Sequence, residues 1–512
     1  MGHIDEIKNL TENFLEKKGR FQIFLIIVLA LNSMSVGINH TITSFYTYKP
    51  NFYCADDDES LNSTCTIGNT TNECQTYSFD PTDDETIVSE FSLVCKNEYI
   101  GPLTNTLYFV GVTIGSLLCN MLCDKFGRKK VVLTCMYSII LLSICVYFGN
   151  SLTLFIIFRI VLGIFVQGLQ TCTYILIMEY SPSRNRTAAA IFWELNWTFG
   201  LMILGGVAYK IHSWRVLTLV MTIPLVLSVI YSWLIPESIS WLYVNNKYHE
   251  CVKAIKSMAK KNQDTATMDA CNTVLKNLEN DITLTSSMEN YNTEDGPKSS
   301  TGIMDVLRSF ILRKHLIIMI AVWFSVTLSY YGILYYLPNL TGQRHINFLV
   351  GAVAENLGYV SSYFVLSRFG RRIPMTFYQI ANGVILIFVG FSYFIEESEV
   401  KGYSVLVLTM LAKGLTVSSF GGMFMYASEL FPTICRGFAL GLCCFAARVA
   451  SLLAPQFMFL ATIIPAYIPM TIIGLLVSAT GLATILLPET LNSTLPNTIE
   501  EAHDVWEKPN KL

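Results

Sequence analysis

Five ionisable side chains lie within stretches of sequence that are otherwise apolar: Arg159 in FRIVLG, Glu194 in FWELNW, Glu355 in AVAENLG, Lys413 in LAKGL and Arg448 in CCFAARVASLLAP. A charge at the centre of a membrane helix costs about 2.5 to 3.5 kcal/mol on insertion scales, so such residues usually pair with an opposite charge or bind a charged solute. A guanidinium presents a planar pair of donors that fits a carboxylate. We therefore expect Arg448 and Lys413 to bind an anionic group of a substrate. The alternative is an internal ion pair with Glu355 or Glu194.

The two buried carboxylates have several possible roles. Glu355 and Glu194 can attract a substrate ammonium group, bind a coupling cation or proton, or pair internally with Arg159. A cavity with charges of both signs suits a zwitterion, whose carboxylate would contact Arg448 while its ammonium group stays near acidic or aromatic side chains.

Aromatic side chains accompany these charges on the predicted fifth and seventh membrane spans. They are Trp197, Trp323, Tyr330, Tyr331 and Tyr335. Aromatic rings favour quaternary ammonium groups by roughly 0.5 to 2 kcal/mol and also stack on flat anions. We predict that they contribute to a substrate site, above all Trp197 and Tyr331. The alternative is helix packing or an interfacial aromatic belt.

Composition indicates the elements that must position these residues. The chain has 512 residues, of which 52% are hydrophobic and only 14% charged, and its mean hydropathy is +0.46. Apolar runs of about 20 residues cross a bilayer, and twelve are predicted, near 21–46, 101–123, 131–149, 152–178, 187–210, 214–235, 314–338, 343–367, 373–395, 403–428, 437–461 and 466–487. The chain is therefore expected to be an all-α membrane protein, with the lipid bilayer as a partner.

Basic residues set the expected orientation. KFGRKK (125–130), SRNR (183–186), RKH (313–315) and RFGRR (368–372) fall in alternate loops, which the positive-inside rule places in the cytosol. Both termini join that side, and we expect a multi-pass protein of the plasma membrane that works as a monomer. The net charge of −3 and the lack of a basic block argue against a nucleic-acid partner. Apolar residues near the N-terminus predict a short interfacial helix or a frayed amphipathic end.

The segment 47–100 is predicted to be extracellular. It contains eleven acidic residues from Asp56 to Glu98 and two glycosylation sequons, at Asn62 and Asn69. Its four cysteines are Cys54, Cys65, Cys74 and Cys95. An even number of cysteines in a translocated loop predicts two disulfide bonds, with three possible connectivities.

Three motifs occur twice in the same order. EYSPSRNR (179–186) returns as ELFPTICR (429–436), DKFGRKK returns as SRFGRR, and PES returns as PET. This repetition predicts two copies of one six-helix unit. The expected domains are a cytosolic N-terminus (1–20), a first bundle (21–235), a cytosolic linker (236–313), a second bundle (314–487) and a cytosolic tail (488–512).

Charged residues of the repeated motifs are predicted to form a gate. The expected pairs are Asp124 with Arg128, Glu179 with Arg186, and Glu429 with Arg436, and Arg371 occupies the second copy of the Arg128 position. Such pairs can hold the two halves together in one state and separate in the other. The alternative is that they act only as topology signals.

The sequence resembles the major facilitator superfamily and, more narrowly, its organic cation, organic anion and carnitine transporters. The similar stretches are ECQTYSFD, TIVSEFSLVCKNEY, LCDKFGRKK, PESISWL and ASELFPTICRGFALG, which together cover nearly the whole chain. The resemblance implies twelve helices in two pseudo-symmetric bundles and transport by alternating access. It also implies that Arg448 stands where anion and carnitine carriers have arginine. Asn120 and Ser367 depart from the usual Gly and Asp of the loop motif.

Other classes of function find little support. No GxxxxGK[ST] loop is present, and the seven histidines show no metal-ligand spacing. We therefore expect neither an enzyme nor a cofactor or metal site, and transport coupled to Na⁺, H⁺ or an exchanged anion. Organic anions or zwitterions are the favoured substrates. Organic cations are the first alternative, and a non-transporting membrane sensor is the second.

Overall fold

The structure is a computed structural model that describes residues 2–17, 19–55, 65, 74–81, 83–182, 185–285, 308–465, 467–491 and 501–502. The predicted glycosylation sites Asn62 and Asn69 lie outside the described residues. Within them the chain is almost entirely helical, with a single two-stranded sheet.

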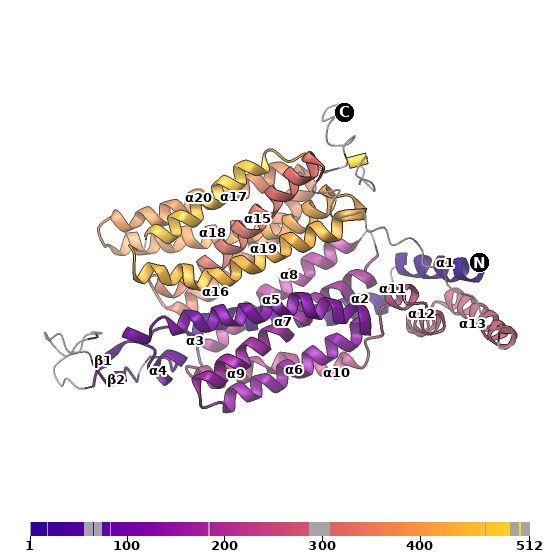
Figure 1. Ribbon diagram of the computed structural model, residues 1–512, viewed down its shortest axis with the longest axis horizontal. Coiled ribbons are helices and arrows are strands. Elements are labelled where there is room, and N and C mark those ends of the chain that lie inside the picture. The colour runs from indigo at the N-terminus through magenta and orange to yellow at the C-terminus, as the bar shows by residue number, and fades with distance from the viewer. Residues whose placement is uncertain are drawn as a thin grey trace.

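Two helical bundles lie side by side along the long axis of the molecule (Figure 1). The first contains α2 (Arg20–Thr41), α3 (Thr43–Tyr46), α5 (Ile100–Phe126), α6 (Arg128–Phe148), α7 (Leu152–Tyr180), α8 (Arg186–Ala208), α9 (Trp214–Met221) and α10 (Ile223–Ser232). The second contains α15 (Phe310–Tyr336), α16 (Arg344–Phe369), α17 (Arg372–Phe391), α18 (Glu399–Leu430), α19 (Thr433–Phe459) and α20 (Tyr467–Thr484), with short 3-10 turns at Leu337–Asn339, Ser392–Phe394 and Leu460–Thr462. Across the bundle interface α5 packs on α19, and α8 packs on α16.

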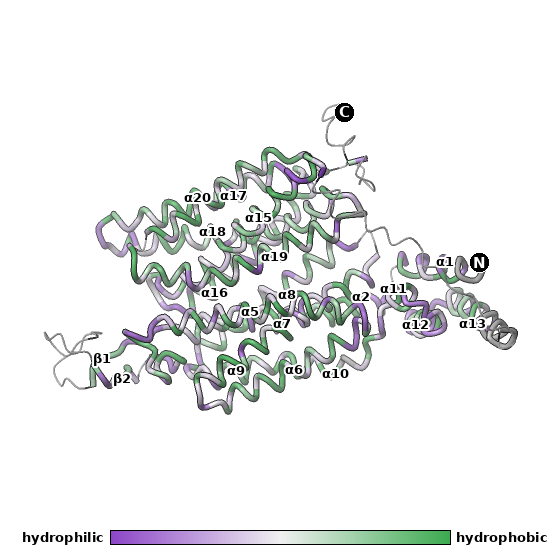
Figure 2. The backbone as a smooth tube through the Cα atoms, viewed as in Figure 1, coloured by the Kyte–Doolittle hydropathy of each residue, from purple (hydrophilic) through white to green (hydrophobic). Residues whose placement is uncertain are grey.

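Eleven helices among the described residues are long and apolar enough to span a membrane. The remaining predicted span, 214–235, is a shorter apolar segment, Trp214–Ile230, broken where α9 ends and α10 begins. Pro224 lies in the first turn of α10, where its missing N–H leaves no helical hydrogen bond unmade. Hydrophobic residues follow the long helices, as Figure 2 shows. The structure is consistent with the twelve-helix arrangement expected from sequence.

The end of the molecule that carries the sheet, which we call the strand end, is formed by the segment before α5 (Figure 1). It contains antiparallel strands β1 (Phe52–Cys54) and β2 (Tyr77–Phe79), the short helix α4 (Ile87–Glu90) and a 3-10 turn, Cys95–Asn97. Of the three connectivities left open by the sequence, the structure contains Cys54–Cys74 and Cys65–Cys95.

The opposite end, which we call the helical end, carries α1 (Gly2–Glu16), α11 (Ile239–Val244), α12 (Tyr248–Asn262) and α13 (Thr265–Thr285). The apolar face of α1 is neither frayed nor interfacial. Ile7 and Phe14 are 1% and 2% exposed because they pack into a core shared with α12. Lys17, just after α1, forms an ion pair with Asp264 at 3.0 Å.

Candidate functional site

Lys413 of α18 and Glu355 of α16 form an ion pair inside the second bundle. Nζ and Oε1 are 3.0 Å apart, and both side chains are 0% exposed. Gly351 makes room for this pair, because a Cβ at that position would lie 2.8 Å from the Lys413 ammonium nitrogen. Each charge thus has an internal partner, and the lysine is not a free cation in this conformation.

The pair connects to the bundle interface through aromatic side chains. The Tyr330 hydroxyl on α15 donates to Glu355 Oε2 at 3.4 Å, and Trp197 Nε1 of α8 donates to the Tyr330 hydroxyl at 3.4 Å. Trp197 belongs to the first bundle and Tyr330 to the second. The buried carboxylate is therefore linked by two long hydrogen bonds to a helix of the other bundle.

Arg448 of α19 lies at the interface, and its side chain reaches toward the first bundle. Its Nη2 donates to Gln170 Oε1 of α7 at 3.4 Å. Among the described residues Arg448 makes no ion pair with a carboxylate, and it is partly exposed although its helix is a membrane span. Tyr331 lies within its electrostatic range. This guanidinium has the accessibility and spare donors that a carboxylate-binding group needs.

Arg159 of α7 pairs with aromatic rings rather than with a carboxylate. Its guanidinium carbon lies 4.2 Å from the centre of the Tyr108 ring and 5.3 Å from that of Tyr46. Its side chain is only 2% exposed. Cation–π contact is strongest where both groups are dehydrated, so the Arg159 charge is held in the protein interior.

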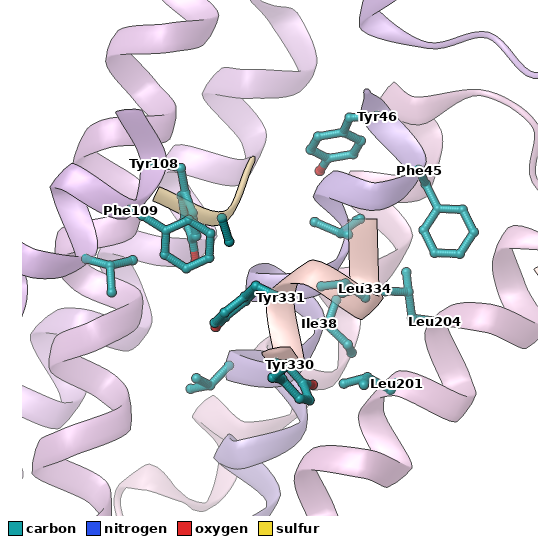
Figure 3. Close-up of a cluster of buried hydrophobic side chains, with 14 of the residues drawn as sticks. Ile38, Phe45, Tyr46, Tyr108, Phe109, Leu201, Leu204, Tyr330, Tyr331 and Leu334 are labelled. Atoms are coloured by element: carbon teal, nitrogen blue, oxygen red, sulfur yellow. The ribbon is translucent and has the colours of Figure 1, made fainter. Parts of the chain in front are cut away.

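Tyr46 and Tyr108 belong to a larger cluster of buried aromatic and aliphatic side chains (Figure 3). Tyr331 packs edge-on against Phe109 at 4.9 Å, and the Tyr108 hydroxyl hydrogen-bonds His40 Nδ1 at 3.0 Å. His40 also faces the Trp197 ring at 5.5 Å. Trp197 and Tyr331 were predicted from the sequence. His40 and Gln170 were not, although each is a polar residue in an apolar span.

The remaining predicted site residues lie elsewhere. Glu194 of α8 is partly exposed and lies beside Tyr359, within electrostatic range of Glu355. Trp323 is buried against Phe424 with ring centres 4.4 Å apart. Tyr335 lines a cavity of about 270 Å³ at the strand end. Among the described residues, no group of three His, Cys, Asp or Glu could hold a metal ion.

The first copy of the predicted gate is a network within the first bundle. Arg128 pairs with Asp124 at 3.1 Å and with Glu179 at 3.2 Å. Glu237 accepts hydrogen bonds from the backbone N–H groups that begin α6, including that of Arg128 at 2.9 Å. Carboxylates are stabilised at helix N-termini by these unpaired donors and by the helix dipole. Glu179 therefore binds Arg128 here rather than the exposed Arg186.

The second copy repeats this network with one change. Arg371 pairs with Glu429 at 2.9 Å, and its N–H donates to Glu489 at 2.8 Å. Ser367 replaces the aspartate of the first copy and bonds only to its own helix, through the Phe364 carbonyl. Arg436 donates to the Phe431 carbonyl rather than to Glu429. All of these contacts stay within one bundle, so none of them joins the two halves in this conformation.

At the strand end a polar contact does join the two halves. Asp84, from the segment before α4, pairs with Arg344 at the start of α16 and with His345 Nε2 at 3.1 Å. Asp83 lies 3.6 Å from Arg344, whose guanidinium stacks on Tyr48 at 3.6 Å. No sequence motif indicated this latch, because Asp83 and Asp84 lie in the acidic segment 47–100 whereas Arg344 and His345 lie far along the chain, at the start of a membrane helix.

Comparison with known proteins identifies the family. Residues 27–503 match the family described as sugar (and other) transporters. Solute carrier family 22 member 6 of Danio rerio is 30% identical over 420 residues, which are 82% of this chain and 72% of that protein. The human organic cation/carnitine transporter 2 is 29% identical, over 81% of this chain and 71% of that protein. The chain belongs to solute carrier family 22 of the major facilitator superfamily.

Membership of this family makes the chain a multi-pass membrane transporter of small organic ions and not an enzyme. The organic cation transporter protein of Drosophila melanogaster is 28% identical, over 86% of this chain and 78% of that protein. The fold agrees with the inward-open xylose transporter XylE from E. coli, which superposes with a TM-score of 0.66 at 17% identity over 95% of this chain and all of that one.

Proposed function

We propose that this family 22 transporter carries organic anions or carnitine-like zwitterions by alternating access. The observation that supports this proposal is the contrast between two cations of the membrane helices. Lys413 is neutralised by Glu355, whereas Arg448 is partly exposed at the bundle interface and its hydrogen bond goes to a neutral amide. A substrate carboxylate would supply the missing anionic partner.

The proposed carrier lies in the plasma membrane with both termini in the cytosol, so that the helical end is cytosolic and the strand end extracellular. The gate networks at the helical end bind within their own bundles, and the Asp84–Arg344 latch joins the bundles at the strand end. This arrangement corresponds to a carrier that is closed to the outside. Energy would come from a Na⁺ or H⁺ gradient or from anion exchange.

Uptake measurements with Arg448→Asp and Arg448→Lys test the substrate class. Cells expressing each form would be given carnitine, tetraethylammonium and p-aminohippurate, with and without Na⁺ and at two external pH values. The proposal expects Arg448→Asp to abolish uptake of the anion or zwitterion, and Arg448→Lys to retain part of it because the charge remains. Unchanged substrate selection in Arg448→Asp would refute the assignment of substrate charge.

An organic cation carrier is the second candidate, because Glu194 offers a partly exposed carboxylate beside the Tyr359 ring. It expects tetraethylammonium uptake that Glu194→Gln abolishes and Arg448→Asp leaves intact. A sensor on the same fold would transport none of the three compounds when the purified protein is reconstituted in liposomes.

A further inference from the structure

Two adjoining cavities at the helical end differ sharply in character. One, of about 590 Å³, is lined by polar and basic residues between the end of α1 and the end of α12, including Lys17, Arg20 and Lys261. The other, of about 420 Å³, is an apolar groove between α2 and the start of α8. Gly19 and Gln22 line both cavities, so the two meet at the turn into α2.

The polar cavity has an excess of positive charge. Lys17, Arg20 and Lys261 line it together with one carboxylate, Asp264, which pairs with Lys17. Lys261 lies 4.1 Å from the centre of the Phe21 ring. Neither Arg20 nor Lys261 forms an ion pair within the described part of the chain, and both are exposed. Two cations are therefore available to an anionic group.

The side chains that line the groove are mostly apolar, as a hydrocarbon chain requires. Its walls include Ile23, Ile26 and Ile27 of α2 and Phe192 of α8. Ile23 and Ile27 are 48% and 45% exposed within a membrane span, so the groove opens along a surface that lipid can reach. A hydrocarbon chain placed there would cover apolar side chains that are otherwise incompletely packed.

The turn between the cavities is held open by specific contacts. Asn262 Oδ1 accepts from the Phe21 N–H at 2.8 Å, and Gln22 Oε1 accepts from the Gly19 N–H at 2.7 Å. A Cβ at Gly19 would lie 2.1 Å from Asn262 Nδ2. Because these groups already form hydrogen bonds with one another, a bound molecule needs to contact only Arg20, Lys261 and the apolar groove.

We propose that this composite site binds an anionic phospholipid of the adjacent leaflet, with its phosphate between Arg20 and Lys261 and an acyl chain in the groove beside α8. Charge complementarity and the order of the two cavities, basic at the membrane surface and apolar below it, favour this occupant. Bound there, the lipid bridges α2, the end of α12 and the segment that precedes α8.

Thermal unfolding of the purified full-length transporter in detergent tests this proposal. Dioctanoyl phosphatidylserine should raise the unfolding midpoint in a saturable manner, and dioctanoyl phosphatidylcholine should do so much less. Glycerol 3-phosphate, tested at the same concentrations, distinguishes a phospholipid from a free phosphate ester. We expect it to leave the unfolding midpoint unchanged because it has no acyl chains. Equal stabilisation by the two lipids, or by glycerol 3-phosphate, would overturn the proposal.

Variants locate the site. Arg20→Gln/Lys261→Gln should weaken the apparent affinity for phosphatidylserine roughly 30-fold, as removal of two basic residues near an anionic surface implies, while Lys253→Gln, an exposed lysine of the same helix α12, should leave it unchanged. Ala188→Trp places a large side chain in the groove without altering charge and should also weaken binding. An unaltered affinity in both the double variant and Ala188→Trp would exclude this site.

Discussion

At the level of single residues, the Lys413–Glu355 pair places two opposite charges in the fully buried interior of the second bundle. Removing one member of a buried ion pair leaves an uncompensated charge and costs about 3 to 5 kcal/mol. We expect Lys413→Met to lower the thermal unfolding midpoint markedly, and Lys413→Met/Glu355→Gln to recover most of the loss, since no charge is then left unpaired. Thermal unfolding of both variants in detergent measures this. Equal stability of the single and double variants would contradict it.

The same variants separate structure from substrate binding at Lys413. If the lysine only neutralises Glu355, the double variant should regain uptake together with stability. If it also contacts substrate, the double variant should be stable but should take up substrate poorly. Glu397→Gln is a suitable control because Glu397 is 91% exposed where it pairs with Lys401 at 2.6 Å, and the loss of an exposed charge from such a pair costs about 0.2 to 1 kcal/mol.

The sequence identified the buried charges but not how they pair. An ionisable residue in an apolar run is a strong local signal, which is why Arg448, Lys413 and Glu355 were all found. Pairing depends on which helix faces meet, and the partners lie on different helices. Gln170 and His40 are polar residues in apolar spans, which is a weaker signal because ordinary packing residues share it.

At the level of elements, the two repeated loops depend on glycines with positive φ. Gly370 has φ +89° between α16 and α17, and a Cβ there would lie 2.6 Å from Glu489 Oε2. We expect Gly370→Ala to cost about 1 to 3 kcal/mol of backbone strain and to displace the carboxylate that accepts from the start of α17. Thermal unfolding measures the loss. Gly441→Ala is the control, because a Cβ there has no neighbour within 4 Å, and it should be neutral or slightly stabilising.

The docking of α1 depends on a carboxylate at the start of α13. Asp264 accepts hydrogen bonds from the Thr267 side chain at 2.6 Å and backbone at 3.0 Å, and these bonds, with Lys17, lower its pKa to about 2. Because the pKa is lower in the folded state, the stabilisation is complete above the usual aspartate pKa of about 4 and is lost as the pH falls through about 2.

Asp264→Ala should therefore loosen this end of the molecule at neutral pH. The loss of a capping side chain costs about 0.5 to 2 kcal/mol, and the exposure of the Lys17 pair means that its loss adds little. Hydrogen exchange should become faster in α1 and the first turn of α13 and stay unchanged in α15. Unchanged exchange in α1 would show that its apolar face alone holds it in place.

At the level of the whole molecule, the repeated motifs predicted two related bundles, and the structure contains them. The prediction succeeded because each motif forms a local network within its own bundle. In the first bundle Tyr180 donates to the Pro236 carbonyl, and in the second Tyr426 donates to the Pro488 carbonyl. The helix packing between the bundles is itself repeated, because α5 on α19 and α8 on α16 are equivalent pairs, but the Asp84–Arg344 contact lies outside the repeated motifs. The sequence therefore gave no sign of the latch between Asp84 and Arg344.

That latch should set the balance between the two open states of the carrier. Asp84 and Arg344 are only 11% and 12% exposed, and truncating one partner of such a desolvated pair costs about 2 to 5 kcal/mol. Asp84→Asn should therefore favour separation of the bundles at the strand end.

The accessibility of a cysteine at position 44 measures this separation. Ser44 lines the cavity at the strand end and is 6% exposed, so in the Asp84→Asn protein a Ser44→Cys probe should react faster with an impermeant maleimide added from that side. Glu90→Gln is the matched control: Glu90 pairs with Arg215 within the same bundle and at the same end, away from the residues that line this cavity, and its loss should leave the labelling rate unchanged. Equal labelling of the Asp84→Asn and Glu90→Gln proteins would mean that apolar packing between α8 and α16, rather than this ion pair, keeps the strand end closed.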